Sequence, residues 1–143
     1  MKYELRTAAE SDIKRIFECY RITVGPYVEK AWGWDELTQI SGFWKHHPLE
    51  EFKVIEIQNE FAGGLHLEED QTNLYIRMIF LLPIHQGNGI GSQVITDIHN
   101  IARRSKKSLM LKVIKCNPAK DLYKRLGFEL INEDETTQDM LWV

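Results

Sequence analysis

Hydrophobic residues follow two different spacings along this chain, and each spacing predicts one type of element. The strongest apolar run covers residues 74–82, which predicts a buried strand that Pro83 ends. After it, apolar residues recur at intervals of three and four, which predicts a helix from Ser92 to about Ser105 with one buried face. These apolar residues are Ile90, Val94, Ile95, Ile98, Ile101 and Ala102.

The first fifty residues predict one strand and two helices. A short strand is expected over residues 3–6, and Thr7 with Glu10 forms a capping-box pattern that opens a helix to about Tyr20. The pair Gly25-Pro26 predicts a break in the chain. A second helical region is expected over residues 34–45, and Pro48 ends it.

The rest of the chain predicts mostly strands. Residues 52–57 and 61–68 are expected to pair through a hairpin at residues 58–60, and residues 109–114 form a later strand. A last helix is expected to begin at Asn117, a good N-cap followed by Pro118, and to end at Gly127, which can adopt a left-handed conformation. Residues 128–131 open a strand, and the polar run 132–139 is expected to be a surface loop before the final strand. The order β-α-α-β-β-β-α-β-α-β-β predicts a mixed α/β fold.

Composition narrows the class of protein. A chain of 143 residues with 43% hydrophobic residues has the size of a single domain, so we assign residues 1–143 to one domain. Its net charge of -3 argues against a nucleic-acid partner. The basic cluster at 103–107 is expected to be a solvent-exposed helix end, where cations interact favourably with the helix dipole, or alternatively to attract a nucleotide phosphate. Cys19 and Cys116 form neither a disulfide nor a metal-site pattern. With no signal-peptide pattern and no apolar run as long as a membrane span, we expect a cytoplasmic protein.

A glycine-rich segment between the strand at 74–82 and the following helix carries the candidate chemistry. The N–H groups of a first helical turn and the positive end of the helix dipole favour an anion, and glycines let the backbone approach it. The segment lacks the lysine and hydroxyl residue of a P-loop, because Gly91 is followed by Ser92 and Gln93. Its glycines at 87, 89 and 91 also miss the dinucleotide fingerprint, and Lys112 stands near the end of the next strand, where that fold has an acid. A plain nucleotide-binding protein is therefore disfavoured.

Two segments instead resemble the GCN5-related N-acetyltransferase (GNAT) family. Gln86, Gly89 and Gly91 match the acyl-CoA signature Q-x-x-G-x-G of that family. The segment from Asn117 to Phe128 is similar to a second family segment, in which an asparagine precedes a helix carrying Leu-Tyr, here Leu122-Tyr123, and then Gly-Phe. The order of the two segments and the gap of about 25 residues between them also fit.

The resemblance implies a mostly antiparallel sheet with splayed central strands and acetyl-CoA as co-substrate. Backbone groups of Ile79, Phe80 and Leu81 would hold the pantetheine arm of the cofactor, and the N–H of Leu81 would face the thioester oxygen as an oxyanion hole does. Asn117 would hold the arm, and the Tyr123 hydroxyl would protonate or hydrogen-bond the departing thiolate. The residues that would surround the pyrophosphate are Gln86, Gly87, Asn88, Gly89, Ile90, Gly91 and Ser92.

The general base is left open by the sequence. Many family members carry a glutamate on the strand before the glycine turn, but the same-side positions here are Tyr75, Arg77 and Ile79. Water, His66, Glu29 or Asp35 are the candidates to accept the proton of the acceptor amine. His46 and His47 have no metal-ligand spacing and are expected to face solvent, and we assign no metal site.

The sequence also leaves the identity of the acceptor open. Residues 27–36 correspond to the region that usually shapes the acceptor pocket of the family, where aromatic rings beside carboxylates suit an ammonium group. Trp32 is expected to pack into the core, whereas Trp34 is open between packing and binding. A small-molecule amine is favoured over a protein acceptor, and a homodimer is left open. The alternative to an active enzyme is an acyl-CoA-binding module without turnover.

Overall fold

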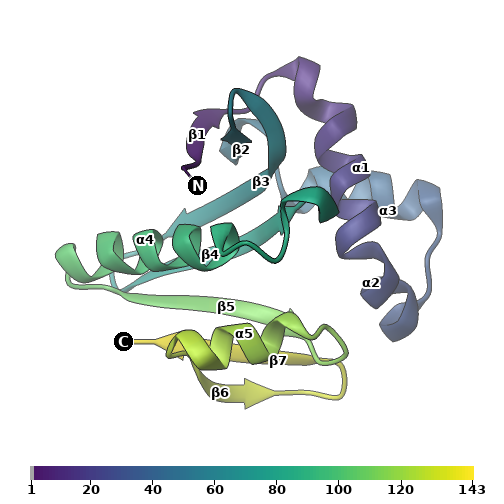
Figure 1. Ribbon diagram of the computed structural model, residues 1–143. Coiled ribbons are helices and arrows are strands. Elements are labelled where there is room, and N and C mark those ends of the chain that lie inside the picture. Colours follow the sequence, from purple (N-terminus) through teal and green to yellow (C-terminus); the bar gives the residue numbers. More distant parts are fainter. Residues whose placement is uncertain (1) are drawn as a thin grey trace.

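The computed structural model describes residues 2–143, and within this range seven strands form one sheet (Figure 1). Their order in the sheet is β1-β2-β3-β4-β5-β7-β6. Every neighbouring pair is antiparallel except β4 and β5, which run parallel. The strands are β1 (Glu4–Thr7), β2 (Phe52–Ile57), β3 (Glu60–Glu69), β4 (Asn73–Leu81), β5 (Ser108–Ile114), β6 (Glu129–Glu133) and β7 (Thr137–Trp142). The mixed, mostly antiparallel α/β fold expected from the sequence is confirmed.

Helices cover both faces of this sheet and give the molecule two hydrophobic clusters. The helices are α1 (Ile13–Thr23), α2 (Gly25–Trp32), α3 (Glu36–His46), α4 (Ile90–Arg104) and α5 (Ala119–Leu126). Val94, Ile95 and Ile98 of α4 belong to the cluster that fills one face, together with Tyr123 of α5. Phe17, Tyr20 and Phe43 of α1 and α3 belong to the cluster on the other face. The apolar period of three and four therefore identified the buried side of α4 correctly.

The two central strands separate along their length. Pairing between β4 and β5 covers only residues 73–76 and 108–111, whereas β5 stays paired with β7 to its end at Ile114. Beyond Ile76, β4 is therefore paired on its β3 side only. The splayed central strands that the family resemblance implied are present. After Ile76, β4 separates from β5 but stays paired with β3.

A β-bulge interrupts β4 at the point where the strands part. His66 pairs with Met78 and Leu67 pairs with Ile76, so Arg77 is the extra residue. The bulge reverses the alternation of side chains: Ile76 and Ile79 share one cluster, and Met78 belongs to the other. Our expectation that Tyr75, Arg77 and Ile79 share one side was wrong for this reason.

Two expectations near the N-terminus need correction. Gly25-Pro26 does end the first helix, since α1 stops at Thr23, but the pair also begins α2, a helix that we did not expect, because proline fits the first turn of a helix. Thr7 does not cap a helix from residue 10, because Glu10–Asp12 forms a short 3-10 turn and α1 begins at Ile13. The capping contact comes from Asp12, whose carboxylate accepts the N–H of Ala9 at 2.8 Å.

Both predicted hairpins exist, although one has a shorter loop than expected. Gln58 and Asn59 take left-handed conformations in the turn between β2 and β3. The polar run expected to be a loop over 132–139 instead continues β6 to Glu133 and starts β7 at Thr137. The carboxylate of Asp134 accepts the N–H groups of Thr136 and Thr137 and closes this tight turn, which a count of polar residues does not reveal.

Candidate active site

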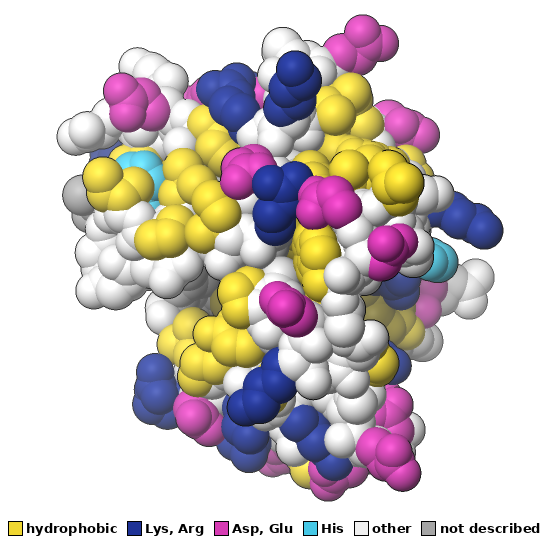
Figure 2. Space-filling view, turned by 90° about the vertical axis from the view of Figure 1, so that its right-hand side faces the viewer, with side chains coloured by type: hydrophobic (Ala, Val, Ile, Leu, Met, Phe, Trp, Pro, Cys, Tyr) yellow, Lys and Arg dark blue, Asp and Glu magenta, His cyan; other side chains and the backbone are white. Residues whose placement is uncertain are grey.

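A cleft with a volume of about 1020 Å³ opens where β4 and β5 part. Its walls come from residues 75–79 of β4 and 110–114 of β5, from α1–α3, and from Asn117 and Tyr123 at the start and middle of the α5 region. Ile79, Asn117 and Tyr123, three residues that the sequence analysis assigned to the site, therefore border the same space. On the α1–α3 side of the molecule, charged side chains of both signs are mixed with hydrophobic ones (Figure 2).

The main chain of β4 presents alternate residues to the gap between the strands. The N–H of Leu82 donates to the carbonyl of Ala62 at 2.7 Å, so Leu82 faces β3. Because antiparallel pairing alternates along a strand, Phe80 also faces β3 and the N–H and C=O groups of Ile79 and Leu81 face the gap. Of the three residues that were expected to hold the cofactor arm by their main chains, Ile79 and Leu81 are oriented for it and Phe80 is not.

The glycine turn has the geometry of an anion cradle. Gly87 and Gly89 have φ values of 80° and 87°, and a Cβ at either position would meet no atom within 4 Å. Gly89 is the N-cap of α4, and being a glycine it has no side chain with which to cap the helix. The N–H groups of the first helical turn, Ile90, Gly91 and Ser92, therefore point out of the helix without an intrahelical acceptor.

Gln86 has a role that the sequence did not reveal. Its Nε2 donates to the carbonyl of Leu81 at 2.9 Å, so the side chain ties the glycine turn back to the end of β4. This bond fixes the turn relative to the unpaired edge of the strand. Leu81 directs two main-chain groups toward the gap. Its carbonyl already accepts the bond from Gln86, so the N–H is the group left to bind a ligand.

Tyr123 lies in the cleft wall with its ring buried. The residue is only 9% exposed, and its ring meets that of Phe128 edge-on at 5.8 Å. Burial raises the pKa of Tyr123 to about 12, so the hydroxyl keeps its proton at neutral pH. Asn117 holds the start of α5, because its Oδ1 accepts the N–H of Ala119 at 2.9 Å. The helix begins one residue later than expected, with Pro118 at the N-cap position, but the Asn117 side chain still accepts an N–H of the first turn.

The candidate bases occupy very different positions. Asp35 caps α3, and the pKa of its carboxyl is lowered by the hydroxyl and N–H of Thr38. Glu29 is exposed on α2. His66, expected to be an ordinary half-buried residue, is 2% exposed, and its Nδ1 lies 2.8 Å from Nδ1 of His47.

His47 is not solvent-facing as we expected. It follows α3, is partly buried against the rings of Phe43 and Phe52, and borders the cleft. The contact with His66 joins residues 19 positions apart on different elements, so no spacing rule in the sequence could have found it. Glu51, in the 3-10 turn Leu49–Glu51, approaches the other side of His66, with Oε1 3.5 Å from Nε2.

Trp32 is not in the core as we expected, and Trp34, which the sequence left open, is a packing residue. Trp32 is 56% exposed and borders the cleft instead of packing in the core. Trp34 packs against Phe17 and Tyr20, and its Nε1 donates to Glu36 at 2.9 Å. The turn at Gly33, with a φ of 84°, directs the two neighbouring rings to different places.

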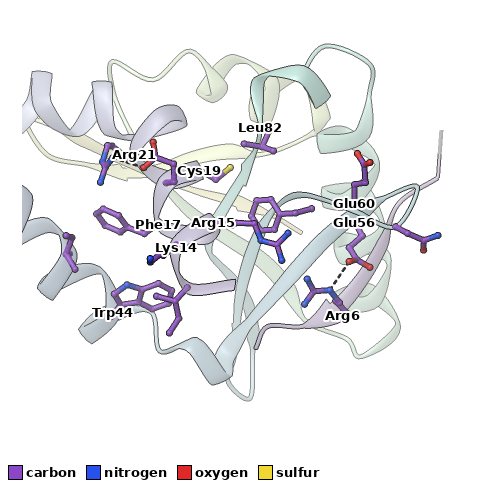
Figure 3. A pocket seen from close by; sticks show the side chains of 15 residues that line it. Arg6, Lys14, Arg15, Phe17, Cys19, Arg21, Trp44, Glu56, Glu60 and Leu82 are labelled. Atoms are coloured by element: carbon purple, nitrogen blue, oxygen red, sulfur yellow. Dashed lines mark hydrogen bonds and ion pairs between the residues drawn. The ribbon is translucent and has the colours of Figure 1, made fainter. Parts of the chain in front are cut away.

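A second hollow of about 1040 Å³ lies beside α1 (Figure 3). None of the residues assigned to the site lines it, although Leu82, the neighbour of Leu81, does. Much of its charge is already paired, since Arg6 binds Asp12 and Glu56 and Arg21 binds Glu18 and Glu36. The cleft between β4 and β5 is therefore the candidate active site.

The chain belongs to the acetyltransferase (GNAT) family, whose model matches residues 12–128. It is an acetyl-CoA-dependent N-acetyltransferase. No match was found among curated proteins. No helix within residues 2–143 is long and apolar enough to cross a membrane, and no group of three potential metal ligands occurs in that range.

Several solved structures share the fold. The PaiA N-acetyltransferase of Thermoplasma acidophilum, in complex with coenzyme A, has a TM-score of 0.77 at 16% identity, with 99% of each chain covered. The N-acetylglutamate synthase of Neisseria gonorrhoeae, complexed with coenzyme A and N-acetyl-glutamate, has a TM-score of 0.67 at 17% identity, over 99% of this chain and 35% of that one. Naa50 of Arabidopsis thaliana, with the bisubstrate analogue CoA-Ac-MVNAL, has a TM-score of 0.66 at 13% identity, over 100% and 99%.

Proposed function

We propose that this enzyme moves the acetyl group of acetyl-CoA directly to a primary amine of a small molecule in the cleft between β4 and β5. The observation that carries the proposal is the convergence of Ile79, Asn117 and Tyr123 on one cavity where the strands part. Two substrates bound side by side in such a cavity react without an acyl-enzyme intermediate, because proximity replaces a nucleophilic side chain.

The cofactor would bind along two surfaces that meet at Gln86. The N–H groups of Ile90, Gly91 and Ser92 would receive the pyrophosphate, since a helix N-terminus favours an anion. The gap-facing groups of Ile79 and the N–H of Leu81 would bind the amide arm as a neighbouring strand would. One of these N–H groups, that of Leu81, would stabilise the thioester oxygen as it gains charge.

The chemistry requires two protons to leave the acceptor nitrogen. An ammonium group loses one proton before its lone pair attacks the thioester carbon, and a second after the C–N bond forms and the C–S bond breaks. One proton ends on the sulfur of coenzyme A, and the other reaches solvent. Tyr123, with a pKa of about 12, is a much weaker acid than a thiol of pKa about 8.5, so its hydroxyl would stabilise the thiolate mainly by donating a hydrogen bond.

A small acceptor is supported by the dimensions of the cleft. Its volume of about 1020 Å³ must hold the end of the cofactor arm as well as the acceptor, and ligand sites for small molecules have about 300–1,000 Å³. The exposed Trp32 at its border offers a flat aromatic face that suits an ammonium group. Since solved structures of this fold hold both an amino-acid derivative and a peptide analogue, the fold alone does not choose between them. We place the enzyme in the cytoplasm, where acetyl-CoA is made and used, and leave a homodimer open.

The decisive experiment measures thiol release from acetyl-CoA with a panel of amines. The panel contains polyamines, aromatic amines, free amino acids and short peptides with free N-termini. We expect thiol release with at least one small amine and a weaker response with the peptides. Release with the peptides alone would contradict the small-molecule assignment, and stabilisation by acetyl-CoA without release from any member would favour a binding module.

A further inference from the structure

Three side chains form a line from the cleft to the protein surface. His47 borders the cleft, and its Nδ1 lies 2.8 Å from Nδ1 of the buried His66. Nε2 of His66 is buried without a hydrogen-bond partner in residues 2–143, and the nearest carboxylate oxygen, Oε1 of Glu51, is 3.5 Å away. Glu51 is 46% exposed on its side chain, so its carboxylate has room to turn toward His66.

The carboxylate decides which way the protons of the two rings point. An ionised carboxylate can only accept, so Nε2 of His66 must carry the hydrogen that faces Glu51. Nδ1 of His66 is then the acceptor, and Nδ1 of His47 must be the donor in the contact between the rings. This leaves Nε2 of His47 without a hydrogen, as a lone pair on the ring that borders the cleft.

The line of residues lies beside the part of β4 that is expected to hold the cofactor arm. His66 pairs with Met78, the residue that follows the bulge and precedes Ile79. His47 stands over His66 with its ring nearly perpendicular, at 5.1 Å between centroids. His47 follows α3 and therefore approaches, from the helical side, the place where many family members have a glutamate on β4.

We propose that His47 is the general base that accepts a proton from the acceptor ammonium at Nε2, directly or through one water, and that His66 and Glu51 hold it in the required tautomer. The proposal rests on the acetyltransferase function given above. The proton moves from nitrogen to nitrogen, and while His47 is charged its Nδ1–H donates to Nδ1 of His66, whose far side faces Glu51. His47 then loses the proton to solvent, so the ring is neutral again before the next turnover. His47 is the catalytic residue, while His66 and Glu51 are positioning residues.

The charged surroundings keep the resting ring neutral. Burial, followed by His66, Arg77 and His46, lowers the pKa of His47 to about 4. Burial also lowers the pKa of His66, against the opposite effects of Glu51 and Glu68. At neutral pH both rings are therefore uncharged, and the lone pair of His47 is available.

The tautomer can be tested without knowing the acceptor. Long-range ¹H–¹⁵N NMR of the full-length protein at pH 7 assigns the protonated nitrogen of each histidine ring. We expect His47 to carry its hydrogen on Nδ1 and His66 on Nε2. The opposite tautomer at His47 would overturn the proposal, whatever the activity. Glu51→Gln should leave the fold intact and shift His47 toward a mixture of tautomers, because an amide can donate as well as accept.

The catalytic role is tested by His47→Gln against the matched control His46→Gln. We expect kcat with the best amine of the panel to fall at least about 100-fold at pH 7 for His47→Gln, with acetyl-CoA affinity unchanged. The loss should shrink as the pH approaches the pKa of the acceptor amine, and added imidazole should restore part of the rate. His46 also borders the cleft but forms no hydrogen bond with His66 within residues 2–143, so His46→Gln tests whether any cleft histidine suffices, and it should keep kcat within about threefold.

The outcomes separate this proposal from the acetyltransferase function. If the wild-type enzyme releases thiol and His47→Gln keeps its kcat, the base is another group and the proposal fails, while the function stands. If the wild-type enzyme acetylates no amine, the function fails at that step, and the NMR tautomer then decides whether His47 is arranged as a base. A loss of rate in His47→Gln that imidazole and high pH do not relieve would indicate a structural role and contradict the proposal.

Discussion

At the scale of single residues, burial determines what Tyr123 can do. Its ring is enclosed between the cleft and Phe128, so the hydroxyl meets low-dielectric surroundings that disfavour the phenolate. With a pKa of about 12, the hydroxyl stays protonated over the whole range in which a thiolate would leave. A hydrogen bond given to a charged acceptor in such a site is worth more than one given in water.

Tyr123→Phe should therefore lower kcat about 10- to 100-fold while the affinity for acetyl-CoA changes less than about twofold. The ring is retained, so its packing against Phe128 survives. Steady-state kinetics with acetyl-CoA and an active amine measure the effect. Tyr3→Phe is the control, because it removes a hydroxyl that binds Asp97 and is not in the cleft wall, and it should leave kcat unchanged.

Asp12 is a second residue whose surroundings fix its charge. Its side chain is fully buried, and it accepts hydrogen bonds from Arg6, Arg15 and the N–H of Ala9. Arg6, above all, holds the pKa of the Asp12 carboxyl far below its usual range. A carboxyl with a lowered pKa stabilises the fold above its unfolded pKa of about 3.9, and this contribution is lost as the pH falls below that value.

Asp12→Asn should lower the free energy of unfolding by about 3 kcal/mol at pH 7, because it leaves two arginines without their buried partner. Urea denaturation at pH 7 and pH 3 should show a smaller pH dependence for the variant than for the wild type. Glu18→Gln removes an exposed partner of Arg21 and should cost less than about 1 kcal/mol. An equal cost for both substitutions would contradict the importance of burial.

At the scale of elements, the junction of β4 and α4 positions the proposed cofactor site. The strand supplies outward-facing amides at Ile79 and Leu81, the helix supplies the N–H groups of its first turn, and Gln86 ties the two together. The left-handed conformation of Gly89 turns the chain between these two surfaces. The angle between strand and helix thus depends on a residue without a side chain.

Gly89→Ala should weaken binding of coenzyme A at least about tenfold, because a side chain at a φ of 87° costs on the order of 1 kcal/mol and rotates the cradle amides. Isothermal titration with coenzyme A measures the change. Gly33→Ala is a stringent control: its φ is 84° and its added Cβ also meets no atom within 4 Å, but it lies between α2 and α3. Because its ψ of 168° lies in a region that essentially only glycine adopts, the control should lose more stability than Gly89→Ala and still keep its affinity for coenzyme A.

Local features were predictable from the sequence, and features that depend on tertiary contacts were not. The bounds of β2 and the buried face of α4 follow from hydrophobic spacing. The bulge at Arg77 could not be predicted, because it arises from the pairing with β3 and leaves no composition signal. The same holds for the His47–His66 contact and for the direction of the Phe80 main chain. The two motifs predicted a cofactor site from the sequence alone, whereas the proposed base depends on a contact that only the fold creates.

At the scale of the whole molecule, one sheet is divided into a part ending at β4 and a part beginning at β5. They are paired at residues 73–76 with 108–111, and the cleft begins where this pairing stops. The helices α1–α3 close one face of the opening, and α4 and α5 lie on the other (Figure 1). The two substrates can therefore approach from opposite faces and meet between the strands.

Amide hydrogen exchange should show which residues of β4 face the gap and which face β3. Binding of coenzyme A should slow exchange of the Ile79 and Leu81 amides about tenfold or more, because those N–H groups acquire partners. The Phe80 and Leu82 amides are already directed at β3 and should change less. Equal protection of all four residues would contradict the assigned orientation of the strand.

The parted strands also have a consequence for the empty protein. The unpaired side of β4 beyond Ile76 is an edge in the interior of a sheet, and a strand edge is a template for pairing with any extended chain. Acetyl-CoA bound as we propose would cover this template. We therefore expect depletion of acetyl-CoA to stop turnover and also to favour self-association of the enzyme.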